Sequence, residues 1–217
     1  MEIRFLGHSC FQIKGRKGIV ATDPYDDSCG LKLPEVSADI VTISHKHADH
    51  NNVAAVSGTA RRKKPFVVAG PGEYEIAGVS IFGFPSFHDD AKGKKRGKNT
   101  VYIIKMDNLR LGHLGDLGEL LNDRQLEEMN GLDLLFIPVG GVYTINAHQA
   151  VEVVAKIQPK IVIPMHYQLP KLNLKLAPVN DFLKASGVEG LEPVNKLVVS
   201  YDKLPEERMT VVFNARG

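Results

Sequence analysis

The chain has 217 residues, of which 43% are hydrophobic and 24% are charged, and its formal net charge at pH 7 is +2. This length predicts a single domain over residues 1–217 with a substantial core, and so small a charge argues against a nucleic-acid partner. The only two cysteines, Cys10 and Cys29, form no CxxC pair, which disfavours a disulfide framework and favours a reducing compartment.

The N-terminal residues lead directly into an expected strand, so we expect no export signal. No apolar run approaches the roughly 20 residues that are needed to cross a bilayer. We therefore expect a soluble, cytoplasmic protein without a membrane partner, and homo-oligomer formation is left open.

Three short strands are expected over residues 3–6, 10–13 and 19–22, and their close spacing favours an antiparallel meander. His8 lies in the turn after the first strand. A pocket role for this histidine and a simple hydrogen bond to backbone are equally open. Asp23 follows the third strand directly.

The densest group of metal-competent residues follows a β-branched apolar run over residues 40–43, which predicts a buried strand. His45, His47, Asp49 and His50 come within six residues of one another. In extended backbone His45 and His47 point to the same side, and a turn after them would leave Asp49 and His50 facing a second ion. Imidazole and carboxylate groups are ligands that zinc, manganese or iron accept.

Further strands are expected to end at other histidines and at an aspartate. An alternating run over residues 79–84 leads to His88, and a hairpin over residues 100–113 leads to Asp116. His113 lies on an otherwise apolar face of that hairpin, so we interpret it as a core histidine.

The last third of the chain predicts helices over residues 146–157 and 179–186, with Ala147, Val151, Val154 and Ala155 on the apolar face of the first. A strand over residues 161–164 delivers His166. His148 is expected to be a solvated residue of the first helical turn, with a pocket role left open.

The pattern His45-x-His47-x-Asp49-His50 after an apolar strand resembles the signature of the metallo-β-lactamase superfamily. The opening Gly-His-Ser-Cys-Phe over residues 7–11 is similar to the start of a small single-domain branch of that superfamily. This branch includes ascorbate-phosphate lactonase-like and phospholipase D-like members. The resemblance implies an α/β fold, the αββα sandwich, in which two mixed sheets lie face to face with helices on the outside.

The resemblance also implies two divalent metal ions, with Zn²⁺ favoured and Mn²⁺ or Fe²⁺ also suitable. One ion would be held by His45, His47 and His88, the other by Asp49, His50 and His166, and Asp116 would bridge the two. Asp49, Asp116 and His166 are the candidate catalytic residues. Asp23 is expected to support the histidine loop by accepting a hydrogen bond from a ligating histidine.

These features predict a metal-dependent hydrolase that uses a metal-bridged hydroxide on a small anionic ester, either a phosphodiester or a lactone. A nucleic-acid-processing nuclease on the same metal centre and a non-catalytic metal-binding module are the alternatives.

The segment over residues 92–98 is basic and spaced by glycines, and it follows His88, so it is expected to stay close to the metals. Within it Arg96 and Lys98 are the candidates for binding an anionic substrate, because a guanidinium can grip phosphate or carboxylate in a bidentate manner. Tyr143, which follows a Gly-Gly pair after a strand, is a further candidate. The alternative is a solvated loop whose charges only aid solubility.

Overall fold

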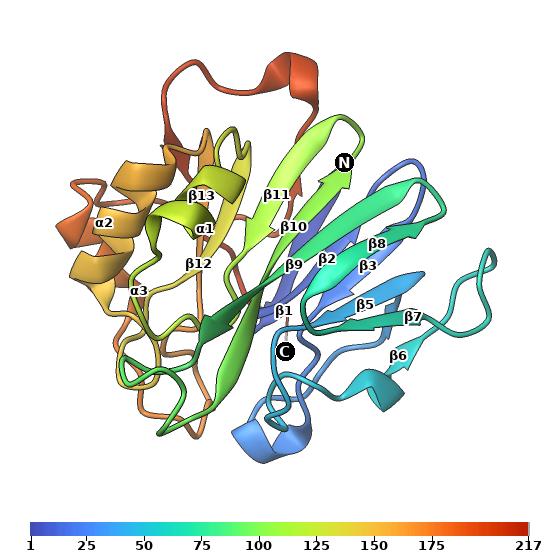
Figure 1. Cartoon of the computed structure of the whole chain (residues 1–217), viewed down its shortest axis with the longest axis horizontal. Helices are drawn as coiled ribbons and strands as arrows, with labels where there is room; N and C mark the ends of the chain where they lie inside the picture. The colour runs from blue at the N-terminus through green and yellow to red at the C-terminus, as the bar shows by residue number, and fades with distance from the viewer. Residues whose placement is uncertain (217) are drawn as a thin grey trace.

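The computed structural model describes residues 1–216 and has two β-sheets packed face to face (Figure 1). One sheet has six strands in the order β14-β1-β2-β3-β5-β7, and the other has seven in the order β15-β13-β12-β11-β10-β9-β8. A two-stranded sheet, β4-β6, accompanies them. The predicted sandwich is confirmed.

The strands of the six-stranded sheet are β1 (Glu2–Gly7), β2 (Cys10–Lys14), β3 (Ile19–Thr22), β5 (Ile40–Ile43), β7 (Phe66–Ala69) and β14 (Leu197–Val198). Those of the seven-stranded sheet are β8 (Gly72–Ile76), β9 (Val79–Phe87), β10 (Lys98–Met106), β11 (Leu109–His113), β12 (Leu134–Pro138), β13 (Ile161–Met165) and β15 (Met209–Thr210). The small sheet pairs β4 (Val36–Ser37) with β6 (Val56–Ser57). The helices are α1 (Asp123–Glu128), α2 (Ala147–Ile157) and α3 (Val179–Ala185), with 3₁₀ turns at η1 (Asp27–Cys29), η2 (Val53–Ala55) and η3 (Tyr201–Lys203).

Both sheets are mixed, as the short alternating segments and the longer crossovers require. Strands β1, β2 and β3 form the predicted antiparallel meander, whereas β3, β5 and β7 run parallel. Strands β10 and β11 form the predicted hairpin, and both residues of its two-residue turn, Asp107 and Asn108, have positive φ. Such a turn matches the right-handed twist of the two strands.

The core lies between the sheets. The ring of Phe11 on β2 lies 4.8 Å from that of Phe5 on β1 and 4.6 Å from that of Phe136 on β12, centroid to centroid, so aromatic contacts join the two layers. The outer face of the six-stranded sheet is different. Glu2, Arg4 and Gln12 are half-buried there, which gives the alternating burial of a sheet with one solvated face.

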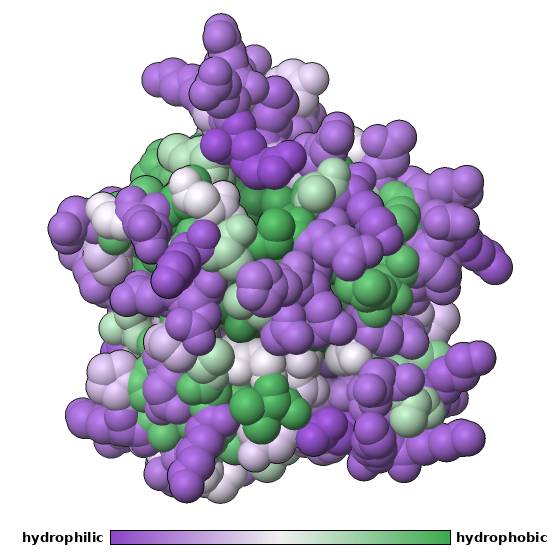
Figure 2. Space-filling view, turned by 90° about the vertical axis from the view of Figure 1, so that its left-hand side faces the viewer, coloured by the Kyte–Doolittle hydropathy of each residue, from purple (hydrophilic) through white to green (hydrophobic). Residues whose placement is uncertain are grey.

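Helices α1, α2 and α3 lie on the outer side of the seven-stranded sheet (Figure 1). Seen from that side, the surface is mostly hydrophilic, with apolar residues gathered between the polar ones (Figure 2). Of the four residues predicted for the apolar face of the residue 146–157 helix, Val154 is buried and Ala147 and Val151 are half-buried against the core, but Ala155 is exposed. The buried residues of α2 are Ala150, Val153, Val154 and Ile157, so the centre of the apolar face is shifted from the predicted one. Asn146, expected as the first residue of this helix, is its N-cap and forms a reciprocal pair of side chain to backbone bonds with Gln149.

No helix within residues 1–216 combines the length and the apolar character that crossing a membrane requires.

Candidate metal centre

Five strand ends meet at one edge of the sandwich and place the candidate ligands together. Strand β1 leads to His8, β5 to the His45–His50 loop, β9 to His88, β11 to Asp116 and β13 to His166. Strands from both sheets contribute, so the cluster closes over the end of the core.

The carboxylate of Asp116 lies at the centre of this cluster. Its Oδ2 lies 3.1 Å from Nε2 of His166, 3.2 Å from Nε2 of both His50 and His88, and 3.9 Å from Nε2 of His45. Asp116 is only 2% exposed. One carboxylate oxygen therefore faces histidines from both of the predicted ligand groups, which is the position that a bridging ligand needs.

The ligand-competent atoms gather in overlapping groups whose members lie within 4.8 Å of one another. These groups are His45, His47 and His88; His45, His50 and Asp116; and His8, His50 and His166. The first group matches one predicted set. The third contains His8 where the prediction has Asp49, and Asp49 lies beside it, with Oδ2 3.3 Å from Nε2 of His8.

The free ring nitrogens of three histidines are held by neighbours. Nδ1 of His50 donates to Oδ2 of Asp23 at 3.0 Å, which is the contact that the expected role of Asp23 needs. Nδ1 of His45 lies 2.9 Å from the Ser44 hydroxyl, and Nδ1 of His88 lies 3.1 Å from the carbonyl oxygen of Tyr143. In each case the other nitrogen, Nε2, is the one that faces the cluster, as metal-binding histidines require.

A metal fits this donor set. Nε2 of His45 and Oδ1 of Asp116 are buried and have no hydrogen-bond partner within the described residues. Buried polar atoms without a partner are unfavourable by about 1–3 kcal/mol each. Imidazole nitrogens with carboxylate oxygens suit zinc and related divalent ions, which would use these atoms as ligands.

Burial sets the protonation of several of these histidines. It lowers the pKa of His8 to about 4 and that of His45 to about 3, so both imidazoles are neutral near pH 7 and can offer a lone pair. For Asp116 burial acts to raise the pKa, but the imidazoles of His166 and His50 outweigh it and hold the pKa well below its usual range. The carboxylate is therefore ionised.

Two other histidines lie apart from the cluster. His113 is fully buried and its Nε2 lies 3.0 Å from the carbonyl oxygen of Ser9, which is the core position that the sequence predicts. His148 is exposed on the first turn of α2 and lines a separate groove with Asp181 and Lys184.

A cleft of about 390 Å³ opens beside the first histidine group. Its lining includes His45, His47, Lys46, Arg96 and Lys98, together with backbone around Gly70. The guanidinium of Arg96 stands 5.2 Å from the ring centroid of Tyr143. The structure thus brings all three candidate substrate-binding residues to this side of the cluster.

The basic segment after His88 has a defined path. The carboxylate of Asp89, only 2% exposed, accepts backbone N–H bonds from Ala91, Gly93, Lys95 and Arg96. The sequence suggested an open glycine-spaced loop, but these bonds wrap it around one buried carboxylate. Nothing in the sequence pattern around Asp89 indicates this role.

Comparison with known proteins agrees with this geometry. The family model of the β-lactamase superfamily domain matches residues 2–166. The chain belongs to the metallo-β-lactamase superfamily. A metal-dependent hydrolase of the UPF0173 group from Pelotomaculum thermopropionicum is 33% identical over 200 residues, covering 77% of this chain and 84% of that protein. A similar protein from Thermococcus onnurineus is 30% identical over 192 residues, with the same two coverages.

Solved structures of this superfamily share the fold. One is a Thermotoga maritima protein described as a Zn-dependent hydrolase of the metallo-β-lactamase superfamily. It superposes with a TM-score of 0.80 and 37% identity, covering 99% of both chains. The short form of human tRNase Z gives a TM-score of 0.57 at 12% identity, covering 78% of this chain and 93% of that one, a likeness of fold alone.

Proposed function

We propose that the protein is a metal-dependent hydrolase that binds two divalent ions, with zinc favoured, and cleaves a small anionic ester such as a phosphodiester or a lactone. The observation that carries the proposal is the position of Asp116. One of its carboxylate oxygens, Oδ2, faces histidines of both ligand groups. The relatives described as metal-dependent hydrolases support the same reaction class.

His45, His47 and His88 would hold one ion, and Asp49, His50 and His166 the other, with Asp116 between them. Two such ions, when bound, activate water as a nucleophile at neutral pH and polarise the bond that is cleaved. The chain itself adds charge and orientation. Asp116 neutralises part of the cationic charge, and Asp23 fixes the ring of His50 so that Nε2 faces inward.

The cleft supports an anionic substrate of small size. Three basic residues line the cleft, Lys46, Arg96 and Lys98. Each brings a positive charge to the side of the cluster where His45 and His47 also line the cleft. A cleft of about 390 Å³ is at the lower end of the range for small-molecule sites. The Asp89 carboxylate accepts a hydrogen bond from the backbone N–H of Arg96, which holds this residue at the cleft before a substrate arrives.

The test combines metal analysis with an activity panel. Protein purified without chelator is expected to carry about two equivalents of divalent metal and to hydrolyse at least one member of a panel of phosphodiesters, phosphomonoesters and lactones. Removing the metal with a chelator should abolish this activity, and adding Zn²⁺ or Mn²⁺ should restore it. Metal content near zero after supplementation, or activity that survives chelation, would contradict the proposal.

A further inference from the structure

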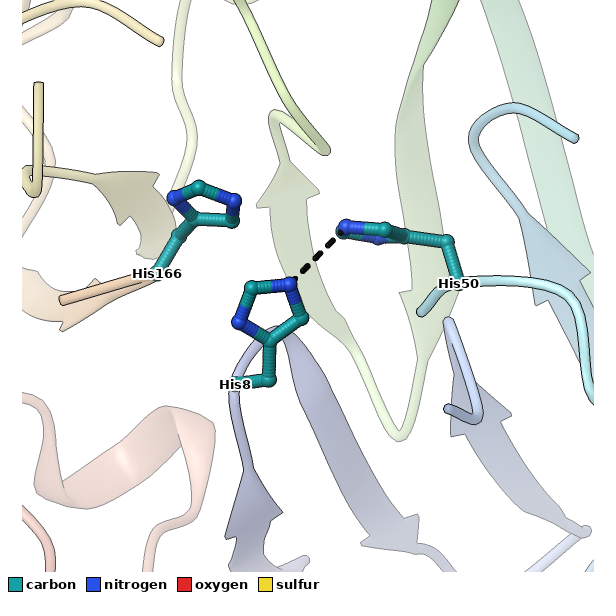
Figure 3. Close-up of side chains that lie close together, drawn as sticks. All are labelled: His8, His50 and His166. Atoms are coloured by element: carbon teal, nitrogen blue, oxygen red, sulfur yellow. Dashed lines mark hydrogen bonds between the residues drawn. The ribbon is translucent and has the colours of Figure 1, made fainter. Parts of the chain in front are cut away.

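His8 lies inside the cluster of candidate metal ligands, on the turn between β1 and β2. It is fully buried, and its Nε2 lies 3.1 Å from Nε2 of His50 and 3.3 Å from Oδ2 of Asp49. Its ring centroid lies 4.4 Å from that of His166. Figure 3 shows the three imidazoles converging from three separate elements.

The backbone is arranged to bring His8 and His166 together. Both residues have positive φ, 56° and 51°, a backbone conformation that residues other than glycine rarely adopt. The N–H of His166 donates to the carbonyl oxygen of His8 at 2.9 Å, which joins the end of β13 to the end of β1 across the two sheets. An unfavourable backbone conformation of this kind persists where the surrounding structure enforces it, and such conformations are often found at functional sites.

A comparison with His113 separates this position from that of an ordinary core histidine. His113 is equally buried, but a backbone carbonyl accepts from its Nε2. His8 has no backbone partner for its ring. Its Nδ1 is buried without a hydrogen-bond partner in the described chain, and its Nε2 faces only groups that can bind a metal.

The spacing of these atoms suits a shared cation. Because Nδ1 of His50 bonds to Asp23, Nε2 is the nitrogen of His50 that faces Nε2 of His8. Two ligand atoms of one tetrahedral zinc ion, each about 2.0–2.1 Å from it, lie roughly 3.3 Å apart. The observed separations of 3.1 and 3.3 Å around His8 are close to that value.

We propose that His8 is an additional ligand of the ion held by Asp49, His50 and His166, an inference that rests on the proposed function. This ligand set would differ from that of the first ion in burial. His8, His50 and His166 are at most 1% exposed and Asp49 is half-buried, whereas His47 of the first group is exposed and lines the cleft. The ion that His8 binds would then be enclosed by protein ligands, and the ion at the cleft would keep an open position for the substrate.

The variant His8→Gln tests the proposal, because glutamine can still donate a hydrogen bond to Asp49 but is a poor zinc ligand. We expect the wild type to bind about two equivalents of metal and His8→Gln to bind the second ion at least about tenfold more weakly in chelator competition. The absorption spectrum of the Co²⁺-loaded variant should also change. The control, His113→Gln, should keep both ions and the wild-type spectrum while its melting temperature falls.

The result that overturns the proposal is a folded His8→Gln protein with unchanged affinity and an unchanged Co²⁺ spectrum. In that case His8 only positions Asp49. A second measurement needs no variant: anomalous diffraction from zinc-loaded wild-type crystals should place Nε2 of His8 about 2.0–2.1 Å from an ion, and a separation beyond 3 Å would overturn the proposal equally. If the wild type binds no metal at all, the proposed function fails as well, so the two failures are distinguishable.

Discussion

Asp23 and His50 form a buried pair that joins the end of β3 to the histidine loop after β5. Oδ2 of Asp23 accepts a hydrogen bond from Nδ1 of His50 at 3.0 Å, and the same carboxylate accepts from the backbone N–H and the hydroxyl of Ser44. Burial acts to raise the pKa of Asp23, but the bond from His50 outweighs it and lowers the pKa. The carboxylate is therefore ionised, and it fixes both the tautomer and the orientation of His50.

Asp23→Asn should weaken metal binding about 10–100-fold, because an amide holds the His50 ring less firmly and makes its Nε2 less basic. Isothermal titration of the metal-free protein with Zn²⁺ measures the effect. Asp27→Asn, at an exposed position of the nearby η1 turn, is the control and should bind metal as the wild type does. Equal affinities for Asp23→Asn and the wild type would show that the pair serves folding alone.

Asp116→Asn should lower metal affinity or activity by about tenfold or more, since an amide cannot neutralise the charge of two cations. Chelator competition and elemental analysis report on the ions, and circular dichroism reports on the fold. A variant that keeps both ions and full activity would show that Asp116 is not the bridging ligand.

His88 and His113 provide a matched pair, because both are buried histidines at the ends of strands of the seven-stranded sheet, β9 and β11. His88→Ala should lose metal. His113→Ala should keep it but lose about 1–3 kcal/mol of unfolding free energy, because the carbonyl oxygen of Ser9 loses its partner. The reverse pattern, with metal lost only in His113→Ala, would overturn the ligand assignment.

Arg96→Ala should raise KM for a phosphate- or carboxylate-bearing substrate while metal content stays the same, since Arg96 lines the cleft. The difference from the wild type should shrink at high salt, because ions screen the attraction. Lys95→Ala is the control from the same segment: its exposed ammonium group pairs with Asp90 at 2.9 Å and does not line the cleft. Equal KM values for Arg96→Ala and Lys95→Ala would make the segment a surface feature only.

Tyr102 connects the two sheets next to the histidine loop. Its hydroxyl donates to the carbonyl oxygen of Ile43 at 2.6 Å and accepts from the N–H of Gly70 at 2.8 Å. Tyr102→Phe should therefore reduce the free energy of unfolding by about 1–3 kcal/mol, with metal content unchanged. Urea denaturation measures this, with Tyr201→Phe, at a 57% exposed position, as the control. Equal stability of the two variants would show that the hydroxyl contributes nothing.

The sequence by itself determined the local features of the protein. The β-branched run before His45 predicts a buried strand, and β5 is that strand. The turn at Asp107 and Asn108 predicts the hairpin of β10 and β11. These predictions succeed because periodicity and turn residues act within a few positions of the chain. The ligand candidates could also be named in advance, because the residue 45–50 pattern resembles the superfamily signature and His88, Asp116 and His166 match the further ligand places which that resemblance implies.

Only the tertiary structure decided which strand ends meet. His8 follows an apolar strand as His88 does, yet the sequence left its role open, because nothing within the first strands shows that the end of β1 lies against the end of β13. Likewise, only the structure shows that His50 is the histidine whose ring Asp23 holds. Both arrangements depend on contacts between distant segments, which form only when the two sheets pack and exclude water from the ends of their strands.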